Sequence, residues 1–454
     1  MGITRLPIPI KHRAAGPVLI VTVNAVASKL PSLACLLSNA YNRGMKNAIV
    51  LLIDRLQASF LGPYGNTWID TPSFNRLAAE SALFEFAFTD STDLSMVYRS
   101  MWGGLHAMSD PRPIPGLAEV ALASGVRTVL ITDEPQVADH PLASGFSEKH
   151  LVPTPPVAAT AQDIGETQLA RLLSSGLDWL HHSTASSDSA RRPFLLWIHS
   201  RGMQAPWDAP FDFRRAFADE DDPEPPDFVQ PPCRWVAQDE DPDELLGIQH
   251  AYAGQISLLD ACLAVFLEAC TTTQADDETL LLLTSPRGYP LGEHGRIGPV
   301  DASLYGESLH VPCLVRYPDL RHAMQRCHPL VQPSDWYATL LDWFSLPRPS
   351  QSHWGNVLGD FLDGQIEPDR ACAVSTACRA LRTATWLLLS NDDAGTHELF
   401  AKPDDRWEIN EVSDRCRDVI PELILLLDEF ERATRSINPP QFSAIPQAVA
   451  SNDR

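Results

Sequence analysis

The alternation of strand-like and helix-like apolar patterns is the feature that most constrains the fold of this chain. Short continuous apolar runs are separated by segments in which apolar residues recur every three or four positions. This order predicts an α/β protein with a large, mostly parallel central sheet flanked by helices. The strand-like runs are Ala48–Ile53, Thr128–Ile131, Phe194–Ile198, Thr279–Thr284 and Pro312–Arg316.

Helical periodicity is clearest in three segments, which place their large apolar residues on one helical face. These segments are 169–180, 248–266 and 334–344. After residue 350 the apolar runs become shorter. A strand is predicted at Thr383–Ser390 and a last helix at Pro421–Phe430.

These changes in the apolar pattern divide the chain into four predicted parts. Residues 1–46 are an N-terminal extension or a possible signal segment, because a basic trio precedes an apolar run there. Residues 47–350 form the α/β domain and residues 351–435 a smaller C-terminal subdomain. Residues 436–454 are polar and read as a flexible tail. Export stays open, with a cytoplasmic location slightly favoured.

Charge and cysteine content narrow the classes of partner. The net charge of −23 argues against nucleic acid and anionic membrane surfaces, both of which attract clustered lysine and arginine. No apolar run is long enough for a membrane span. The nine cysteines form no C-x-x-C pair, which indicates free thiols. Asp219 to Glu244 holds eleven acids and one base and is interpreted as a solvated loop.

A series of motifs resembles the sulfatase family of the alkaline-phosphatase-like superfamily, in the family's order. The likeness covers Asn47 to Phe430 and includes "LGPYGNTWIDTPSFNRLAAESALFEFAF", "PFLLWIHSRGMQAPWDAPFDFRRAF", "TLLLLTSPRGYPLGEHG" and "LYGESLHVPCLVRYP". The resemblance implies one calcium ion at the carboxyl ends of the strands. Two successive acids on the first strand and an Asp-Asn or Asp-His pair on a later strand would bind it. The implied nucleophile is a formylglycine, made from cysteine or serine in a C/S-x-P-x-R motif.

The positions implied to bind calcium depart from this pattern. Asp54 is kept, but Arg55 takes the second acid position, and Pro286 and Arg287 take the later pair. Outside the calcium positions, Gln204 stands in the aromatic-proline loop where the resemblance implies a histidine. Calcium needs about six to eight oxygen ligands, which proline and arginine side chains do not supply. We therefore expect no metal and no other cofactor. We expect one of the two arginines, with Arg287 favoured over Arg55, to replace the cation beside Asp54, because an unpaired buried carboxylate is costly. Arg55 is expected to point away from Asp54.

The segment "STDLSMVYRSMWGGLHAM" matches the nucleophile motif only in part. One register places Leu94 at the nucleophile and Tyr98 at the arginine of the motif. Sliding by one residue places Ser95 four residues before Arg99, but puts Val97 at the proline. Ser95 is thus the candidate nucleophile, and it would need a metal to activate it. The candidate anion-binding residues are Arg99, Arg287 and His294, the last from the G-E-H-G motif.

These observations support two hypotheses about function. The first is a sulfatase-like protein that has lost calcium binding and sulfate-ester hydrolysis. It would keep a structural or binding role, with a sulfated or other anionic small molecule or glycan as partner. The alternative is a divergent sulfuric-ester (arylsulfatase-type) or phosphoric-ester hydrolase that uses Ser95 or Thr92 with calcium. A phosphoryl or phosphoethanolamine transferase would also need a metal. The nearest other acids, Asp90, Asp93 and Asp133, are interpreted as polar loop residues, so the first hypothesis is favoured.

Overall fold

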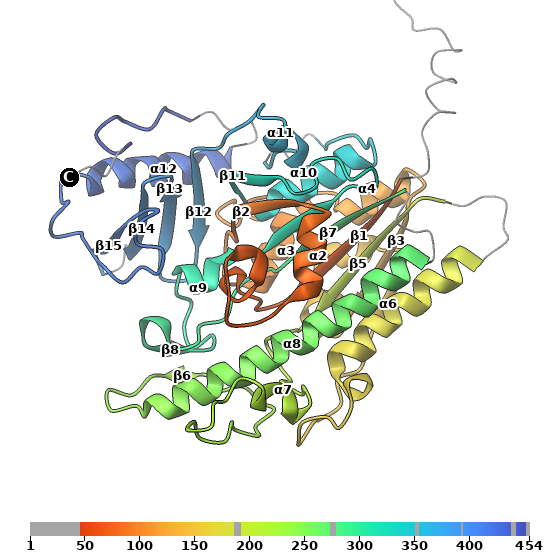
Figure 1. Cartoon of the computed structure of the whole chain (residues 1–454). Coiled ribbons are helices and arrows are strands. Elements are labelled where there is room, and N and C mark those ends of the chain that lie inside the picture. The colour runs from red at the N-terminus through yellow and green to blue at the C-terminus, as the bar shows by residue number, and fades with distance from the viewer. Residues whose placement is uncertain are drawn as a thin grey trace, which may run out of the picture. The chain divides into compact units, whose positions relative to one another are not determined.

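The structure is a computed structural model that describes residues 46–185, 192–272, 278–349, 354–391, 394–436 and 442–450. These residues belong to one compact unit, Met45–Arg454. Its main feature is a nine-stranded sheet with helices on both faces (Figure 1). The predicted fold class, an α/β fold with a mostly parallel central sheet, is confirmed.

The strand order in this sheet is β11-β2-β10-β7-β1-β5-β3-β4, with β9 paired to β2. The strands β4, β3, β5, β1 and β7 run parallel to one another, and β11 is parallel to β2. Strand β10 is antiparallel to β7 and β2, and β9 is antiparallel to β2. The strands are β1 Asn47–Ile53, β2 Ala82–Phe88, β3 Arg127–Thr132, β4 Glu148–Leu151, β5 Phe194–Ser200, β7 Thr279–Thr284, β9 His310–Val311, β10 Cys313–Arg316 and β11 Arg326–Val331.

Strand β1 shows why the apolar runs are continuous. Alternate side chains of a strand point to opposite faces. Ile49 and Leu51 enter one core of the sheet, whereas Val50 and Leu52 enter the other. A strand buried on both faces needs apolar residues at every position, so its sequence lacks an alternating pattern.

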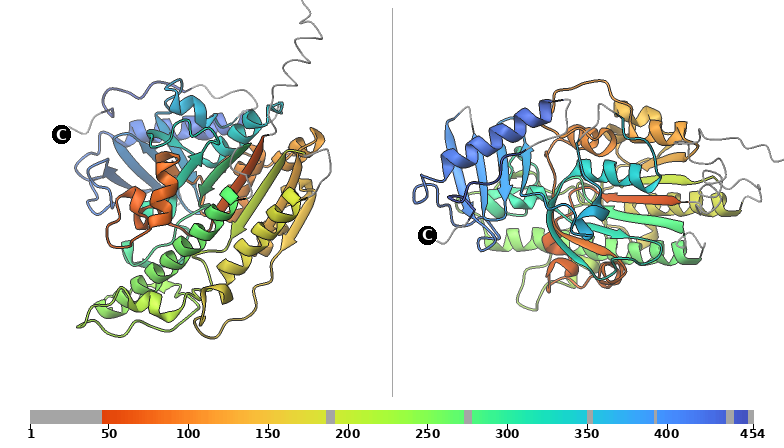
Figure 2. Two further views of the ribbon diagram at one scale, coloured as in Figure 1. Left: turned by 45° about the vertical axis from the view of Figure 1, so that its right-hand side comes forward. Right: turned by 90° about the horizontal axis from the view of Figure 1, so that it is seen from above.

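Two groups of helices cover the two faces of the sheet (Figures 1 and 2). One group is α2 Pro72–Ala79, α6 Gln168–Ala185 and α8 Pro242–Thr272. The other group is α3 Leu94–Gly103, α4 Leu117–Ala123, α10 Pro333–Trp343 and α11 Leu358–Leu362. Helix α8 has the length and apolar content of a membrane span, but 67% of that stretch is buried inside the protein. It is therefore read as a core helix.

A second, antiparallel sheet follows in the C-terminal part, with the order β12-β13-β14-β15. Its strands are β12 Arg370–Val374, β13 Arg379–Thr383, β14 Trp386–Asn391 and β15 Thr396–Ala401, and α12 Ile420–Arg435 packs on it. The single strand predicted at Thr383–Ser390 is wrong at its start. The Thr383 hydroxyl accepts the N–H of Trp386 at 3.1 Å and closes a turn between β13 and β14. The domain boundaries at 350 and 435 stay predictions.

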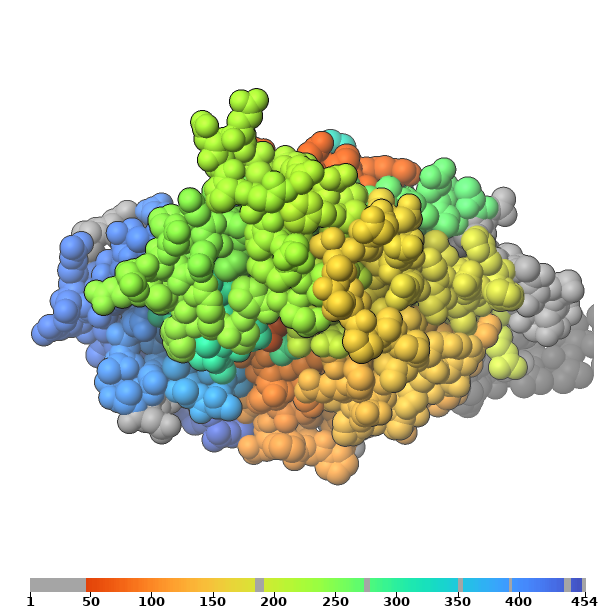
Figure 3. Space-filling model, turned by 90° about the horizontal axis from the view of Figure 1, so that it is seen from below, coloured from red at the N-terminus to blue at the C-terminus, as the bar shows by residue number. Residues whose placement is uncertain are grey.

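Residues 442–450, part of the predicted tail, pack against this subdomain. The Phe442 ring stacks on Phe430 of α12 at 5.4 Å, and Val449 is buried in the same core. The acid-rich segment from Asp219 to Glu244 is mostly exposed loop, on the face seen in Figure 3. The remaining short elements are α5 Pro135–Ala138, α7 Phe211–Arg215, β6 Arg234–Trp235, β8 Arg296–Ile297 and α9 Gly306–Leu309.

Candidate functional site

Three neighbouring parallel strands end at the same edge of the large sheet. Asp54 follows β1, Ser200 ends β5, and Arg287 lies three residues beyond the end of β7. The backbone N–H of Asp54 donates to the carbonyl of Ser200 at 2.9 Å, which ties the ends of β1 and β5 together. Ligand sites of α/β folds lie at such carboxyl ends.

Arg287 forms a two-pronged ion pair with Asp54 at this edge. Its Nε donates to Oδ1 at 3.1 Å and its Nη2 to Oδ2 at 3.0 Å. The side chains are 10% and 1% exposed, respectively. Two further donors of the guanidinium bind the carbonyl of Thr92 at 2.8 Å and Oε1 of Gln204 at 3.1 Å. Four of the roughly five N–H groups of an arginine are thus used.

The charges of the pair stabilise each other against burial. Burial acts to raise the pKa of Asp54, but the cations Arg287 and Arg55 outweigh it and lower that pKa below its ordinary value. Burial acts to lower the pKa of Arg287, and Asp54 outweighs it and raises that pKa. The pair is therefore fully ionised at neutral pH, with its charge neutralised locally.

Arg55 has a different set of contacts. Its Nη1 donates to the carbonyl of Gly288 at 3.1 Å, and its own carbonyl accepts the hydroxyl of Tyr252 at 2.9 Å. Burial and the nearby charge of Arg287 lower its pKa to about 9. Its backbone φ of 65° is left-handed. The prediction from sequence assumes that Arg55 continues the alternation of β1. Instead, the chain turns at Arg55, and this turn sets the direction of its side chain.

His199, which sequence reasoning missed, is the second-last residue of β5 and is buried close to Asp54. Its Nδ1 lies 2.7 Å from the hydroxyl of Tyr98, which also accepts Nε1 of Trp197 at 3.4 Å. Burial lowers the pKa of His199 to about 4, against the pull of Asp54, so the ring is neutral at pH 7. The only signal in the sequence is a histidine at the end of an otherwise apolar strand.

The three other acids near the strand ends have local partners. Asp133 accepts the N–H of Arg201 at 2.8 Å, and burial raises the pKa of its carboxyl to about 6. Asp90 accepts the N–H of Ala107 at 2.9 Å, and burial likewise raises its pKa to about 6. Asp93 caps α3 by accepting the N–H of Met96 at 2.9 Å. In the part of the chain that the structure describes, no group of three or more His, Cys, Asp or Glu side chains is placed to hold a metal ion.

Ser95 and Arg99 line a surface hollow together with Arg112 and His140. Nε2 of His140 donates to the backbone carbonyl of Ser95 at 3.2 Å, rather than to its hydroxyl. Nη2 of Arg99 donates to the carbonyls of Ala107 at 2.7 Å and Ser109 at 3.0 Å. Arg99 thus holds the loop after α3 in place.

His294 lies in a third environment. Its Nδ1 is 3.0 Å from Oε1 of Glu307 and its Nε2 is 3.0 Å from the carbonyl of Glu408, while its ring stacks on Tyr305 at 3.8 Å. Burial acts to lower its pKa, but Glu307 outweighs it and raises the pKa to about 9. The sequence candidates are thus divided: Arg287 joins Asp54, whereas Arg99 and His294 each bind their own partners.

Calcium, which the resemblance implies, does not fit the residues at the strand ends. Both carboxylate oxygens of Asp54 are occupied by a guanidinium, and a second guanidinium, that of Arg55, is buried nearby. The buried Pro286 has no side-chain oxygen. A divalent cation here would meet one carboxylate and two positive charges, instead of the oxygen-rich shell that calcium requires.

The architecture is shared with solved hydrolase structures. The phosphonate monoester hydrolase of Agrobacterium radiobacter superposes with a TM-score of 0.68 at 18% identity, over 85% of this chain and 96% of that one. A protein solved in complex with its substrate D-glucosamine-2-N,6-O-disulfate gives a TM-score of 0.71 at 15% identity, over 88% of this chain and 100% of that one. This chain thus shares the fold of these two proteins.

A family assignment follows from the sequence itself. The sequence model of the sulfatase family matches residues 46–346, so the chain belongs to the sulfatase family. Iduronate 2-sulfatase of Homo sapiens is 22% identical over 65% of this chain and 64% of its own length. N-sulphoglucosamine sulphohydrolase of Homo sapiens is 24% identical over 68% of this chain and 63% of its own length. The chain therefore spans slightly less than two thirds of these curated relatives.

Proposed function

We propose that this sulfatase-family protein has lost calcium binding and metal-assisted hydrolysis of sulfate esters. The observation that carries the proposal is the buried, two-pronged Arg287–Asp54 pair. The pair uses both carboxylate oxygens of Asp54, the one acid kept at the positions that the family resemblance implies for calcium. Pairing of a guanidinium with a carboxylate also offsets the desolvation cost that a lone buried Asp54 would carry. The pair then has a structural role, since it joins the ends of β1 and β7.

A binding role fits the same proposal. One related solved structure holds a disulfated glucosamine as its substrate, and another is a 2-O glycosaminoglycan sulfatase. By analogy, the ligand of this chain would be a sulfated or other anionic small molecule or glycan. The contacts of Arg99, Arg287 and His294 with protein groups favour a binding site made from other residues.

The loss of metal binding is tested by titration calorimetry with calcium on the full chain. We expect no saturable heat in the wild type. Substitution of Arg55→Asp, Pro286→Asp and Arg287→Asn together restores an acid-rich set, and it provides the matched positive control. Binding of calcium to the wild type at micromolar concentration would overturn the proposal.

The alternative, a divergent sulfuric-ester or phosphoric-ester hydrolase using Ser95, is tested in parallel. Turnover of aryl sulfate and aryl phosphate is measured with calcium, zinc or manganese, in the wild type and in Ser95→Ala and Asp54→Ala. We expect no turnover above the rate with buffer alone. Turnover that both substitutions abolish would establish the alternative, in which Ser95 is the nucleophile and calcium the cofactor.

A further inference from the structure

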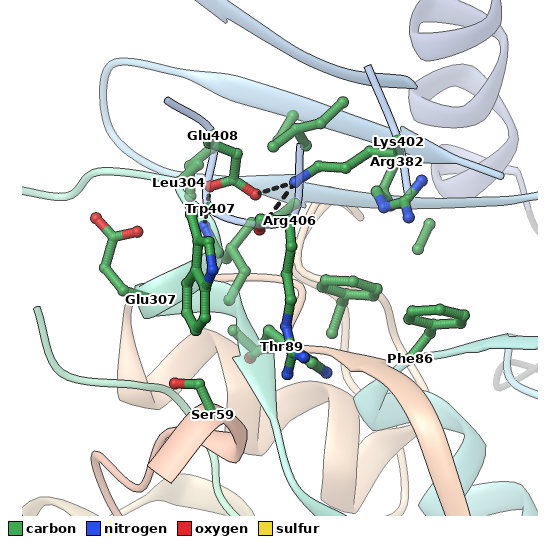
Figure 4. A pocket seen from close by; sticks show the side chains of 18 of the residues that line it. Ser59, Phe86, Thr89, Leu304, Glu307, Arg382, Lys402, Arg406, Trp407 and Glu408 are labelled. Atoms are coloured by element: carbon green, nitrogen blue, oxygen red, sulfur yellow. Dashed lines mark hydrogen bonds and ion pairs between the residues drawn. The ribbon is translucent and has the colours of Figure 1, made fainter. Parts of the chain in front are cut away.

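A cavity of about 240 Å³ lies between the edge of the large sheet and the C-terminal sheet (Figure 4). Strand β2 contributes Phe86 and Phe88, β13 contributes Arg382, and the loop after β15 contributes Arg406 and Trp407. In Figure 4, Arg382 and Phe86 lie on one side of the cavity and Trp407 on the other. The cavity is separate from the Asp54–Arg287 pair, neither of whose residues lines it.

Among the residues that the structure describes, Arg382 is a buried cation that forms no ion pair. It is 8% exposed, and its Nη1 is buried with no hydrogen-bond partner among the residues that the structure describes. Its guanidinium carbon lies 5.9 Å from the ring centroid of Phe86 and 5.9 Å from that of Phe88. Burial lowers the pKa of Arg382 to about 10 in spite of the charge of Glu408. A buried guanidinium normally has a carboxylate or several carbonyls as partners.

Other charged side chains that line the cavity have partners of their own: Glu85 accepts Nη1 of Arg326 at 2.7 Å, and Nη2 of Arg406 donates to the carbonyl of Tyr64 at 3.1 Å. Glu408 accepts Nζ of Lys402 at 2.8 Å, and Glu307 pairs with His294 at 3.0 Å. The charge of Arg382 acts on Lys402 and is itself attracted by Glu408. Among the lysines and arginines that line the cavity, Arg382 is the one with a buried nitrogen that has no hydrogen bond to the described residues.

The remainder of the wall is suited to a ring. Phe86, Phe88, Leu304 and Leu387 are apolar, and Trp407, which is 53% exposed, stands where the cavity meets solvent. The volume is below the roughly 300–1,000 Å³ of sites for drug-sized ligands, so a single ring with one substituent fits it best. Apolar surface combined with placed polar groups is the usual composition of a small-molecule site.

We propose that this cavity binds a small, ring-bearing monoanion, whose carboxylate or sulfate group pairs with Arg382 while its ring packs between the phenyl rings of β2 and Trp407. The site deepens the binding role proposed above, on which it rests for its ligand class. It does not depend on the loss of hydrolysis.

The test uses benzoate and phenyl sulfate as probes, with uncharged benzamide and inorganic sulfate as references. Binding to the full chain is followed by calorimetry. We expect one molecule of benzoate, phenyl sulfate or both to bind at millimolar concentration or below. Benzamide should not bind, and inorganic sulfate should bind more weakly than phenyl sulfate. Binding of only one of the two anions assigns the acidic group of the ligand.

The Arg382→Met substitution removes the charge and keeps the aliphatic stem. It should weaken binding at least about tenfold, because a charge-assisted hydrogen bond is lost. Arg382→Gln gives a second variant of similar shape should the first fail to fold. The matched control is Arg432→Met on the exposed side of α12, which should bind as the wild type does.

Equal affinity of the wild type and both Arg382 variants would overturn the proposal. So would binding of benzamide as tight as that of benzoate, or no binding of either anion at millimolar concentration. Release of phenol from phenyl sulfate in these samples would contradict the loss of hydrolysis instead, and would leave the proposed site standing.

Discussion

Two buried arginines of this protein differ in what surrounds their charge. Arg287 at the strand ends has a carboxylate, a carbonyl and an amide oxygen on its guanidinium. Arg382, beside the C-terminal sheet, faces two phenyl rings and a cavity. The pKa of the first is raised, mainly because Asp54 outweighs burial, whereas burial lowers the pKa of the second to about 10.

The difference separates a structural ion pair from a site that awaits a ligand. A buried charge whose donors are saturated by protein groups has nothing left to offer to another molecule. A buried charge without a counter-ion lowers the stability of the fold until an anion binds. Burial of an arginine therefore does not indicate a ligand site by itself; the partners of its guanidinium and the space beside it must be considered as well.

The largest expected effect comes from breaking the Arg287–Asp54 pair. Arg287→Met leaves a buried carboxylate unpaired and should lower the free energy of unfolding by about 3–5 kcal/mol. Chemical denaturation measures this change. The double variant Asp54→Leu/Arg287→Met should recover most of the loss, since it removes both charges. A double variant no more stable than the single one would contradict the assignment of the effect to the pair.

His294 is an intermediate case, because its charge depends on pH. The pKa of His294 in the folded protein, about 9, is above the ordinary value of 6.5. Its ion pair with Glu307 therefore stabilises the fold fully below pH 6.5, and this contribution is lost as the pH rises toward 9. The loss should be no more than about 3 kcal/mol. Thermal unfolding of the wild type and His294→Gln across this range measures it. Parallel pH profiles of the two proteins would show that the pair contributes nothing.

Arg382→Met should change the free energy of unfolding in the direction opposite to Arg287→Met. Removal of a buried cation without a counter-ion should raise the free energy of unfolding by about 1 kcal/mol, or leave it unchanged. Denaturant titration beside the exposed Arg432→Met variant gives the comparison. A loss of stability similar to that of Arg287→Met would mean that Arg382 has a protein partner after all, and would remove the contrast.

The smallest expected effect is that of calcium on the wild type. A ligand that binds only the folded state raises the unfolding temperature. Because Arg287 occupies Asp54, millimolar calcium should change the midpoint by less than about 1 °C, apart from the general effect of salt. Magnesium chloride at equal ionic strength is the control. A calcium-specific rise in the midpoint would contradict the assignment of Asp54 to Arg287.

The sequence predicts the fold and part of the candidate site. Continuous apolar runs mark the buried parallel strands, and residues that follow such strands meet at one edge of the sheet. This is why Asp54 and Arg287, 233 positions apart, can be paired from sequence. The contacts of Arg55 could not be predicted in this way, because the chain leaves the strand at that residue with a left-handed φ of 65°.

Other parts of the site depend on contacts that spacing does not encode. His199 is a single polar residue in an apolar strand, and only the neighbouring Tyr98 explains its position. The cavity beside Arg382 is built from segments between residues 57 and 408. Whether its arginine has a counter-ion depends on where every nearby acid points. Sequence patterns identify charged residues, but not which of them remain without a partner.

The Arg287–Asp54 ion pair limits which substitutions its two positions can accept. Substitution of either residue alone leaves an unpaired charge in the interior. We therefore expect substitutions at 54 and 287 to be tolerated only when they occur together. Homologues should accordingly show correlated identities at these two columns, with arginine at 287 found beside aspartate at 54 wherever the acid at 55 is missing.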